Sequence, residues 1–270
     1  MTGTVRFHGG APFRAAAVHG GPGAPGSAAG LAREMARWCG TLEPLQTENS
    51  IGKLIEELAG VLRQDGWPPM VLAGHSWGAW LAALTAERHP ELISGLILIG
   101  CPPLEERFVP CIASRRRAML SPEDRREFDR LVFALESGGG APPDSMLLRK
   151  LGILAGKADS CSLLPGDSTS QVNGTQYAAV WKEAAELRRS GYLLRRFRSL
   201  RIPVVLIQGE MDPHPAEGVT EPLRGSGVAL RSHLLPECGH TPWRERFAAE
   251  TFRRILAEEL SRSTFEQREC

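Results

Sequence analysis

The amino-acid sequence predicts an α/β protein with a mostly parallel central sheet flanked by helices. Up to residue 101, short apolar runs alternate with longer segments of helical period, and such alternation favours parallel strands joined by helices. The run 96–99 (LILI) is apolar at every position, which is typical of a strand buried between two helix layers. Residues 70–88 read as a strand, a sharp turn at Ser76 and a helix. The other elements are interpreted around this unit.

The N-terminal segment predicts a strand hairpin, a helix and a short strand. Residues 5–18 are expected to form the hairpin, with the turn at residues 9–12 (GGAP). After a glycine-rich loop, residues 27–38 carry apolar side chains at helical spacing behind Ser27, which is a candidate cap. Residues 42–45 follow as a strand, and Pro44 confines it to a position that tolerates a missing N–H.

A second helix and the strand–turn–helix unit come next. Ser50 is expected to cap a helix that ends at residues 66–69 (GWPP). The apolar strand from residue 70 then leads to the turn, and the helix after it stops near Pro90. The strand at 96–99 completes this half of the predicted core.

In the middle of the chain, residues 102–200, the alternation of apolar strands with helices stops, and no convincing strand is found. Helices are predicted at 121–136, 144–157 and 177–198, and residues 138–143 (GGGAPP) are interpreted as a hinge or linker. A helical insertion between sheet strands is what a lid over an active site looks like in sequence. The predicted organisation is therefore a core domain of residues 1–101 and 201–270 with a helical cap of residues 102–200.

The last part of the chain returns to the core pattern. Strands are predicted at 204–207 and 228–235, and an amphipathic helix is predicted at 243–260. The chain contains no internal repeat that we could identify. Each of these two strands is followed by a polar residue that is a candidate for the active site, Asp212 after the first and His240 after the second.

Ser76 is the candidate nucleophile. It lies between Gly74 and Gly78 in a G-x-S-x-G pattern at a strand-to-helix turn, which is the pattern of a nucleophile elbow. A serine hydroxyl needs a histidine to accept its proton and an acid to orient that histidine. Asp212 and His240 both follow predicted strands, in the chain order Ser, Asp, His that this elbow accompanies. We therefore predict a catalytic triad.

An oxyanion hole is predicted from the glycine-rich loop. Residues 19–23 (HGGPG) follow a short strand, and glycines there expose backbone N–H groups to a ligand. Gly20 or Gly21 can supply one donor, and the backbone of Trp77 can supply the other. His19 is interpreted as a residue that braces this loop.

Taken together, four motifs resemble the α/β-hydrolase superfamily and, more narrowly, its branch with proline iminopeptidases: HGGPG at 19–23, GHSWG at 74–78, GEMD at 209–212 and Gly239-His240. The resemblance implies the α/β-hydrolase fold, with a variable cap after the strand at 96–99. It also implies Ser76 as nucleophile, His240 as general base and Asp212 as orienting acid, with the oxyanion site as assigned above. In iminopeptidases acidic cap residues hold the substrate's free amine, and Glu183 or Glu186 are candidates for that role here.

Composition limits the partners of the protein. The 32 basic and 31 acidic residues leave a net charge of +1, so no nucleic-acid or strongly anionic partner is predicted. No apolar run is long enough for a membrane span. Six cysteines lack paired spacing and the N-terminus lacks an apolar signal core, so reduced thiols and a cytoplasmic location are expected. The oligomeric state stays open.

The sequence thus predicts a serine hydrolase that cleaves an ester or amide bond of a small molecule or short peptide through an acyl-enzyme on Ser76. No metal or organic cofactor is required by this chemistry. Two alternatives stay open: a proline iminopeptidase-type aminopeptidase, and a hydrolase-fold protein that binds a ligand without turning it over.

Overall fold

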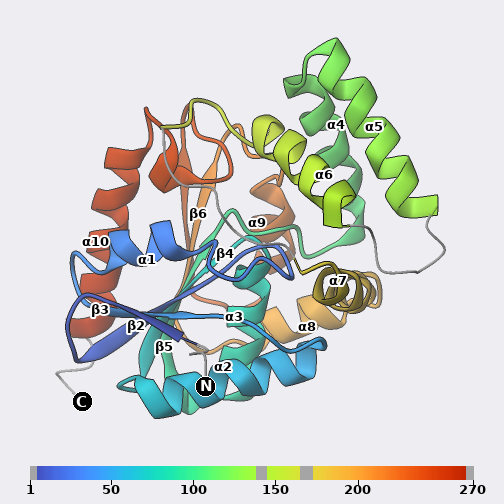
Figure 1. Cartoon of the computed structure of the whole chain (residues 1–270). Helices are drawn as coiled ribbons and strands as arrows, with labels where there is room; N and C mark the ends of the chain where they lie inside the picture. The colour runs from blue at the N-terminus through green and yellow to red at the C-terminus, as the bar shows by residue number, and fades with distance from the viewer. Residues whose placement is uncertain (1–4, 138–144, 165–172, 266–270) are drawn as a thin grey trace.

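A seven-stranded sheet with the order β1-β3-β2-β4-β5-β6-β7 forms the centre of the computed structural model, which describes residues 5–137, 145–164 and 173–265 (Figure 1). β1 pairs with β3 in antiparallel orientation, and every other neighbouring pair is parallel. The mostly parallel sheet predicted from the sequence is therefore confirmed. The strands are β1 (Val5–His8), β2 (Phe13–Val18), β3 (Gly40–Pro44), β4 (Met70–His75), β5 (Ile93–Ile99), β6 (Val204–Gly209) and β7 (Leu230–Leu235).

Helices cover both faces of the sheet. Helices α1 and α10 lie on one face, and α2, α3 and α8 lie on the other, while α4, α5 and α6 project from one end of the molecule (Figure 1). The helices are α1 (Ala29–Met35), α2 (Ile51–Asp65), α3 (Trp77–Arg88), α4 (Val109–Met119), α5 (Pro122–Ser137), α6 (Ser145–Ala158), α7 (Gly174–Arg189), α8 (Tyr192–Arg198), α9 (Glu217–Leu223) and α10 (Ala249–Phe265).

The core follows the two-residue period of the strands. In β5, Leu96 and Leu98 join the apolar cluster that contains α2 and α3, whereas Ile97 and Ile99 join the cluster that contains α1 and α10. Successive side chains of a strand point to opposite faces of the sheet, so a strand that is apolar throughout has to be covered on both sides. This double burial holds the carboxyl ends of the parallel strands, where the candidate site residues lie, in fixed positions.

The predicted hairpin of residues 5–18 is wrong. β1 and β2 do not pair with each other, because β3 lies between them and pairs with both. The carboxylate of Glu43 on β3 is fully buried and contacts His8 Nε2 at 2.8 Å and Arg6 Nη1 at 3.6 Å, both on β1. A buried carboxylate needs such partners, and they hold β1 against β3.

Of the two predicted serine caps, Ser27 is wrong, and Ser50 is the N-cap residue of α2 without a side-chain cap bond. The Ser27 hydroxyl is buried without a hydrogen-bond partner in the described part of the chain, and α1 begins only at Ala29. Ser50 does precede α2, but its side chain makes no cap bond. The first backbone N–H of α2, that of Ile51, instead donates to the Glu183 carboxylate at 2.8 Å.

The middle segment is helical, as predicted, but its helices are placed differently. α5 and α6 lie close to their predicted ranges, α4 was not predicted, and the predicted helix 177–198 is two helices, α7 and α8, separated at Gly191 in the left-handed conformation (φ 67°). Residues 138–143 lie outside the described residues. Helices α5 and α6, together with Leu120 just after α4, form a small apolar cluster of their own, whereas α7 and α8 join the main core.

The C-terminal part differs from prediction at its ends. The strand predicted from residue 228 begins at Leu230, and the helix predicted from residue 243 is a short 3-10 turn, η3 (Pro242–Arg244), followed by α10 from Ala249. The five cysteines in the described ranges are free thiols. Across those ranges, the helices are all too short or too polar to cross a membrane.

Candidate active site

Ser76 occupies a sharp turn between β4 and α3. Its backbone has φ 54° and ψ −123°, a conformation that non-glycine residues rarely adopt. The turn is held by the backbone N–H of Ser76, which donates to the Ile99 carbonyl at the end of β5 at 2.8 Å. Backbone strain of this kind is typical of a nucleophile elbow. The side chain is half-buried, so a substrate can reach it.

The two glycines of the elbow are required by close packing. A Cβ atom at Gly74 would overlap the backbone of Gly78, and a Cβ atom at Gly78 would overlap the carbonyl groups of Val18 and His19 at the end of β2. The absence of side chains therefore lets β4 and α3 meet at the elbow. It also brings the loop that follows β2 beside Ser76.

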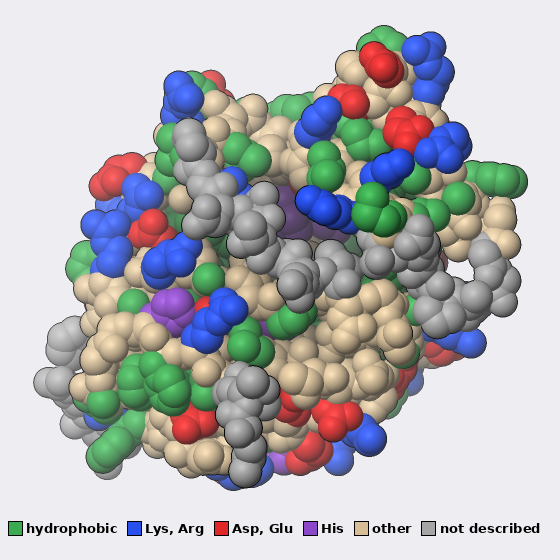
Figure 2. Space-filling view, viewed as in Figure 1, with side chains coloured by type: hydrophobic (Ala, Val, Ile, Leu, Met, Phe, Trp, Pro, Cys, Tyr) green, Lys and Arg blue, Asp and Glu red, His purple; other side chains and the backbone are tan. Residues whose placement is uncertain are grey.

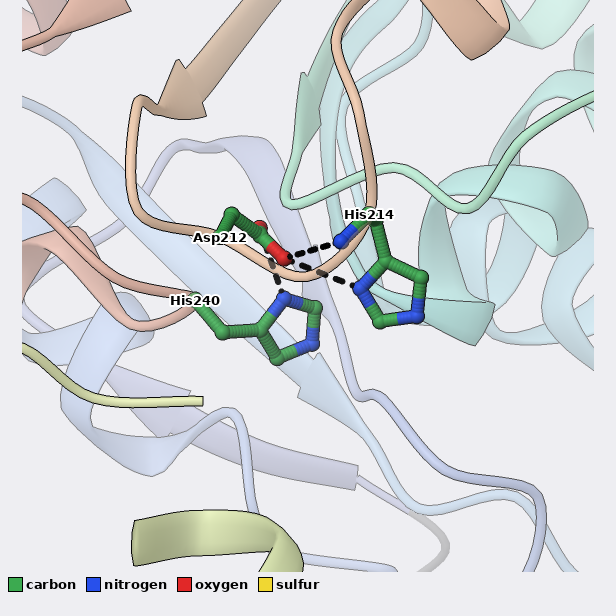
Figure 3. A group of neighbouring side chains, drawn as sticks. All are labelled: Asp212, His214 and His240. Carbon is green, nitrogen blue, oxygen red and sulfur yellow. Dashed lines mark hydrogen bonds and ion pairs between the residues drawn. The ribbon is translucent and has the colours of Figure 1, made fainter. Parts of the chain in front are cut away.

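The Asp212 carboxylate is fully buried and accepts four hydrogen bonds. One oxygen accepts from His240 Nδ1 at 2.8 Å and from Gln208 Nε2 at 2.9 Å, and the other accepts from the backbone N–H of His214 at 2.9 Å and from its Nδ1 at 3.0 Å. The two imidazoles approach the carboxylate from different sides (Figure 3). This saturation fixes the carboxylate in one orientation.

The pKa values of this group follow from burial and from these contacts. Burial would raise the pKa of Asp212, but the imidazoles of His240 and His214 lower it well below its usual range. Burial would lower the pKa of His240, but the Asp212 charge and hydrogen bond outweigh burial and raise it. Burial lowers the pKa of His214. Because Nδ1 of His240 donates to Asp212, its Nε2 is left to accept a proton.

Several contacts place His240 beside the elbow. A Cβ atom at Gly100, the residue after β5, would lie 2.8 Å from the His240 ring. The ring centroid of His75, the residue before Ser76, lies 4.6 Å from that of His240, and His75 Nε2 donates to the His240 carbonyl at 2.9 Å. Burial lowers the pKa of His75 to about 3, so it is neutral. Within the described residues, the Ser76 hydroxyl makes no hydrogen bond.

The loop after β2 provides backbone donors next to Ser76. A Cβ atom at Gly20 would lie 3.0 Å from the Ser76 Cβ, so the loop backbone passes directly over the serine. Among the described residues, the backbone N–H groups of Gly20, Gly21 and Trp77 have no acceptor in the protein. Unpaired N–H groups beside a nucleophile are suited to a developing negative charge.

Helix α4 and the end of α6 contact the residues around Asp212 and His240. Arg115 Nη1 donates to the Asp212 carbonyl at 3.0 Å, and Arg116 makes two hydrogen bonds of 2.6 and 2.7 Å to the Asp159 carboxylate. The Asp159 carbonyl accepts from the backbone N–H of His240 at 2.7 Å. Figure 2 shows a hollow between the core and the cap, with a histidine at its floor and a basic side chain at its edge.

The candidate cap residues Glu183 and Glu186 have other contacts. Glu183 accepts from the first backbone N–H of α2, as described above. Glu186 is exposed and pairs with Arg189 at 2.8 Å. Neither contact leads to Ser76, so the structure gives no support to a role in holding a substrate amine.

Asp212, His214 and His240 are the group of residues in the described chain that could hold a metal ion, with ligand atoms within 4.8 Å of one another. Both Nδ1 atoms, however, are hydrogen-bonded to the carboxylate (Figure 3). A carboxylate of Asp212 that orients the His240 imidazole and is supported by the His214 imidazole accounts for every contact in the group. We therefore interpret it as a hydrogen-bonded cluster.

Sequence reasoning missed Gln208 and His214 as partners of Asp212, and Gln46 as a partner of the glycine-rich loop. Gln208 gives a signal, because it is the polar residue at the end of an otherwise apolar strand. His214 is two residues from Asp212, a spacing at which a carboxylate often accepts from the local backbone. Gln46 has no such signal in the sequence.

The comparisons with known proteins identify the family and the fold of the chain. The model of the alpha/beta hydrolase family matches residues 12–254. The match covers most of the chain, which therefore belongs to the alpha/beta hydrolase family, and the predicted fold is confirmed. The sequence has no significant match among curated proteins.

Solved structures share the fold at low sequence identity. The structure of VinJ has a TM-score of 0.70 at 18% identity, and the match covers 95% of this chain and 94% of that one. The structure of proline iminopeptidase of Mycobacterium smegmatis has a TM-score of 0.64 at 19% identity, and the match covers 97% of this chain and 95% of that one. The thioesterase domain from the curacin biosynthetic pathway has a TM-score of 0.61 at 18% identity, and the match covers 94% of each chain. These similarities establish the fold and leave the substrate open.

Proposed function

We propose that the protein is a serine hydrolase that cleaves an ester or amide bond of a small substrate through an acyl-enzyme on Ser76. The observation that carries this proposal is the pairing of two features: Ser76 lies on a strained strand-to-helix turn, and the His240 imidazole, hydrogen-bonded to the buried Asp212 carboxylate, packs against His75, the residue before Ser76. Strained backbone conformations of this kind cluster at active sites, which supports a catalytic role for Ser76.

In the proposed mechanism, the Ser76 oxygen attacks the carbonyl carbon while its proton passes to His240 Nε2. The negative charge on the carbonyl oxygen is held by the backbone N–H of Trp77 and that of Gly20 or Gly21. The tetrahedral intermediate then expels an alcohol or amine, which takes the proton from His240. Water, deprotonated by His240, attacks the acyl-enzyme, releases the acid and restores Ser76.

A proline iminopeptidase-type activity is the second candidate. It is favoured by the HGGPG loop and by the likeness to the iminopeptidase of Mycobacterium smegmatis. The contacts of Glu183 and Glu186 do not favour it, because an aminopeptidase needs an acidic group near the substrate amine. A ligand-binding protein without turnover is the third candidate, and the ordered Asp212–His240 pair argues against it.

The experiment is a substrate panel. Purified protein and Ser76→Ala are assayed with p-nitrophenyl acetate, butyrate and octanoate and with prolyl-, alanyl- and leucyl-naphthylamides. Ester turnover that Ser76→Ala abolishes supports the main proposal, and turnover of amides with a free amino terminus supports the iminopeptidase. If Ser76→Ala is as active as the wild type, the acyl-enzyme proposal is wrong.

The proposed substrate is a small molecule or a short peptide, and the proposed location of the protein is the cytoplasm. Free thiols in the described residues are in keeping with a reducing compartment. This location is tested by cell fractionation of the native protein.

A further inference from the structure

The glycine-rich loop is braced by a buried network around Gln46, the second residue after β3. The members of this network are His19, Gln46, Trp77 and Gln176, and each has at most 5% of its surface exposed. Gln46 contacts the loop on one side and the elbow on the other. A buried polar network specifies a geometry only when its donors and acceptors match, and the donors and acceptors of Gln46 and His19 can be assigned one by one.

The orientation of the Gln46 amide follows from Trp77. The indole Nε1–H of Trp77 is a donor only, and it donates to Gln46 Oε1 at 3.0 Å. The other end of the amide must therefore be the NH2 group, which donates to the His19 carbonyl at 3.3 Å. One side chain thus links the residue after the nucleophile to the residue before Gly20.

His19 is assigned in the same way. Its Nε2 accepts from the Gln46 backbone N–H at 3.2 Å, so the proton of the ring lies on Nδ1, which donates to the Gly20 carbonyl at 3.0 Å. Burial lowers the pKa of His19 to about 4, so the ring is neutral and this tautomer holds. His19 is therefore a bracing residue of the loop, in agreement with the interpretation of the sequence.

These bonds fix the direction of the two candidate oxyanion donors. In a trans peptide the carbonyl and the following N–H point in opposite directions. The bond to the His19 carbonyl therefore sets the direction of the Gly20 N–H, and the bond to the Gly20 carbonyl sets that of the Gly21 N–H. The remaining candidate donor is the backbone N–H of Trp77, and the same Gln46 amide holds the indole ring of this residue.

Gln176, in the first turn of α7, extends the network to the cap segment. Its Nε2 donates to the Gln46 carbonyl at 3.2 Å and to the Glu48 carbonyl at 2.8 Å. The backbone N–H of Asn173, just before α7, donates to the Gly23 carbonyl at 2.7 Å. Helix α7 is thereby attached both to Gln46 and to the far end of the glycine-rich loop.

We propose that Gln46 is a positioning residue of the oxyanion hole, which orients the donors on both sides of Ser76, and that Gln176 supports Gln46 from α7. The inference rests on the proposed function for its catalytic consequence, but the orientation of the loop can be measured without turnover. Gln46 touches no substrate in this account and acts through the His19–Gly20 peptide and Trp77.

The test compares Gln46→Met, which keeps the volume and loses both hydrogen bonds, with Thr47→Val. Thr47 is the next residue, and among the described residues its hydrogen bonds go to Glu57 on α2. Loss of one oxyanion donor lowers kcat about 100- to 1000-fold, so a misdirected donor is expected to lower kcat about 10- to 100-fold, with KM nearly unchanged. Thr47→Val should match the wild type, and the melting temperature of each variant checks folding.

Two readouts separate positioning from a structural role. The first is the rate with p-nitrophenyl acetate against its thiono analogue, because a thiocarbonyl sulfur is a weak acceptor; the defect of Gln46→Met should be several-fold smaller for the thiono ester. The second is the NMR shift of the Gly20 and Gly21 amides, which should move in Gln46→Met and stay in Thr47→Val.

Each outcome decides a different claim. If the wild type is active and Gln46→Met matches it with both esters, the positioning role is overturned and the proposed function stands. If the wild type shows no Ser76-dependent turnover, the proposed function fails. The amide shifts then decide whether Gln46 orients the loop: moved shifts support the inference, and unmoved shifts overturn it.

Discussion

The two parts of the helical segment that follows β5 differ in how they are joined to the sheet. Helices α7 and α8 contribute Val180, Ala184 and Phe197 to the main apolar core. Helices α5 and α6 and Leu120, just after α4, instead form a small cluster of their own, including Phe128 and Leu131. The outer helices α4–α6 contact the loops that carry Asp212 and His240 through Arg115, Arg116 and Asp159. The inner part is thus built as core, while the outer part is attached by polar contacts.

This difference separates the parts of the molecule by their proposed roles. The candidate catalytic groups come from the sheet ends, and the network around Gln46 extends to α7; burial of these parts permits one arrangement. The outer helices border the hollow of Figure 2 and do not belong to the main apolar core, so fewer packing contacts fix their positions. We infer that the chemistry depends on the core and α7, and that the outer helices are the place where the substrate is selected.

The largest expected effect lies at the sheet ends. Asp212→Asn keeps the shape of the side chain but removes the charge that holds His240 in the required tautomer. We expect kcat to fall about 10⁴-fold, measured with the ester that the panel identifies. A loss below about tenfold would mean that Asp212 does not orient the base.

The second prediction concerns stability and contrasts the two parts directly. Phe197→Ala, on α8, should lower the free energy of unfolding by about 3–5 kcal/mol, because it opens a cavity in the main core. Phe128→Ala, on α5, should act on the outer cluster alone. Urea titration measures the first effect.

Hydrogen exchange followed by mass spectrometry measures where each variant opens. Phe128→Ala should accelerate exchange in α4–α6 and leave the sheet protected. If Phe128→Ala lowers the protection of the whole chain as much as Phe197→Ala does, the two parts form one cooperative unit and the comparison is wrong.

A smaller effect is expected where the outer helices meet the His240 loop. Arg116→Ala leaves the Asp159 carboxylate without its cation. Because the Asp159 carbonyl accepts from the backbone N–H of His240, a shift of Asp159 also moves His240. We expect a loss of stability of about 1–3 kcal/mol and a several-fold lower rate. The matched control is Arg117→Ala, whose partner Asp129 is exposed, and it should change stability by less than about 0.5 kcal/mol. Equal effects of the two variants would contradict the account.

The smallest expected effect is a displacement of the pH profile. His240 acts as a base only when it is neutral, and its pKa is raised above the ordinary value by Asp212. The kcat/KM should therefore be low at acid pH and rise with pH through a midpoint above about 6.5. A midpoint well below that value, measured from about pH 5 to about pH 9, would show that Asp212 does not stabilise the protonated ring.

The sequence predicted the sheet and the elbow because each has a local cause. The apolar strand at 96–99 and the glycines around Ser76 impose burial and close packing that few folds satisfy, and Asp212 and His240 follow their strands in the expected order. Strand pairing at the edge was missed, because β1 is held against β3 by the distant pair of His8 and Glu43.

The cap residues could not be predicted for a related reason. Glu183 contacts the start of α2, which lies 132 residues earlier in the chain, and Gln176 contacts Gln46, which lies 130 residues earlier. No local pattern records such contacts. An acidic residue on a helix therefore looks the same in sequence whether it caps another helix or binds a substrate amine.

The central claim is that Ser76 is an activated nucleophile, and intact-mass spectrometry after reaction with a fluorophosphonate tests it most directly. We expect one adduct on the wild type and on Ser50→Ala, a serine that makes no cap bond, and none on Ser76→Ala. His240→Ala should react far more slowly. An unmodified wild type, or an adduct that persists in Ser76→Ala, would contradict the account.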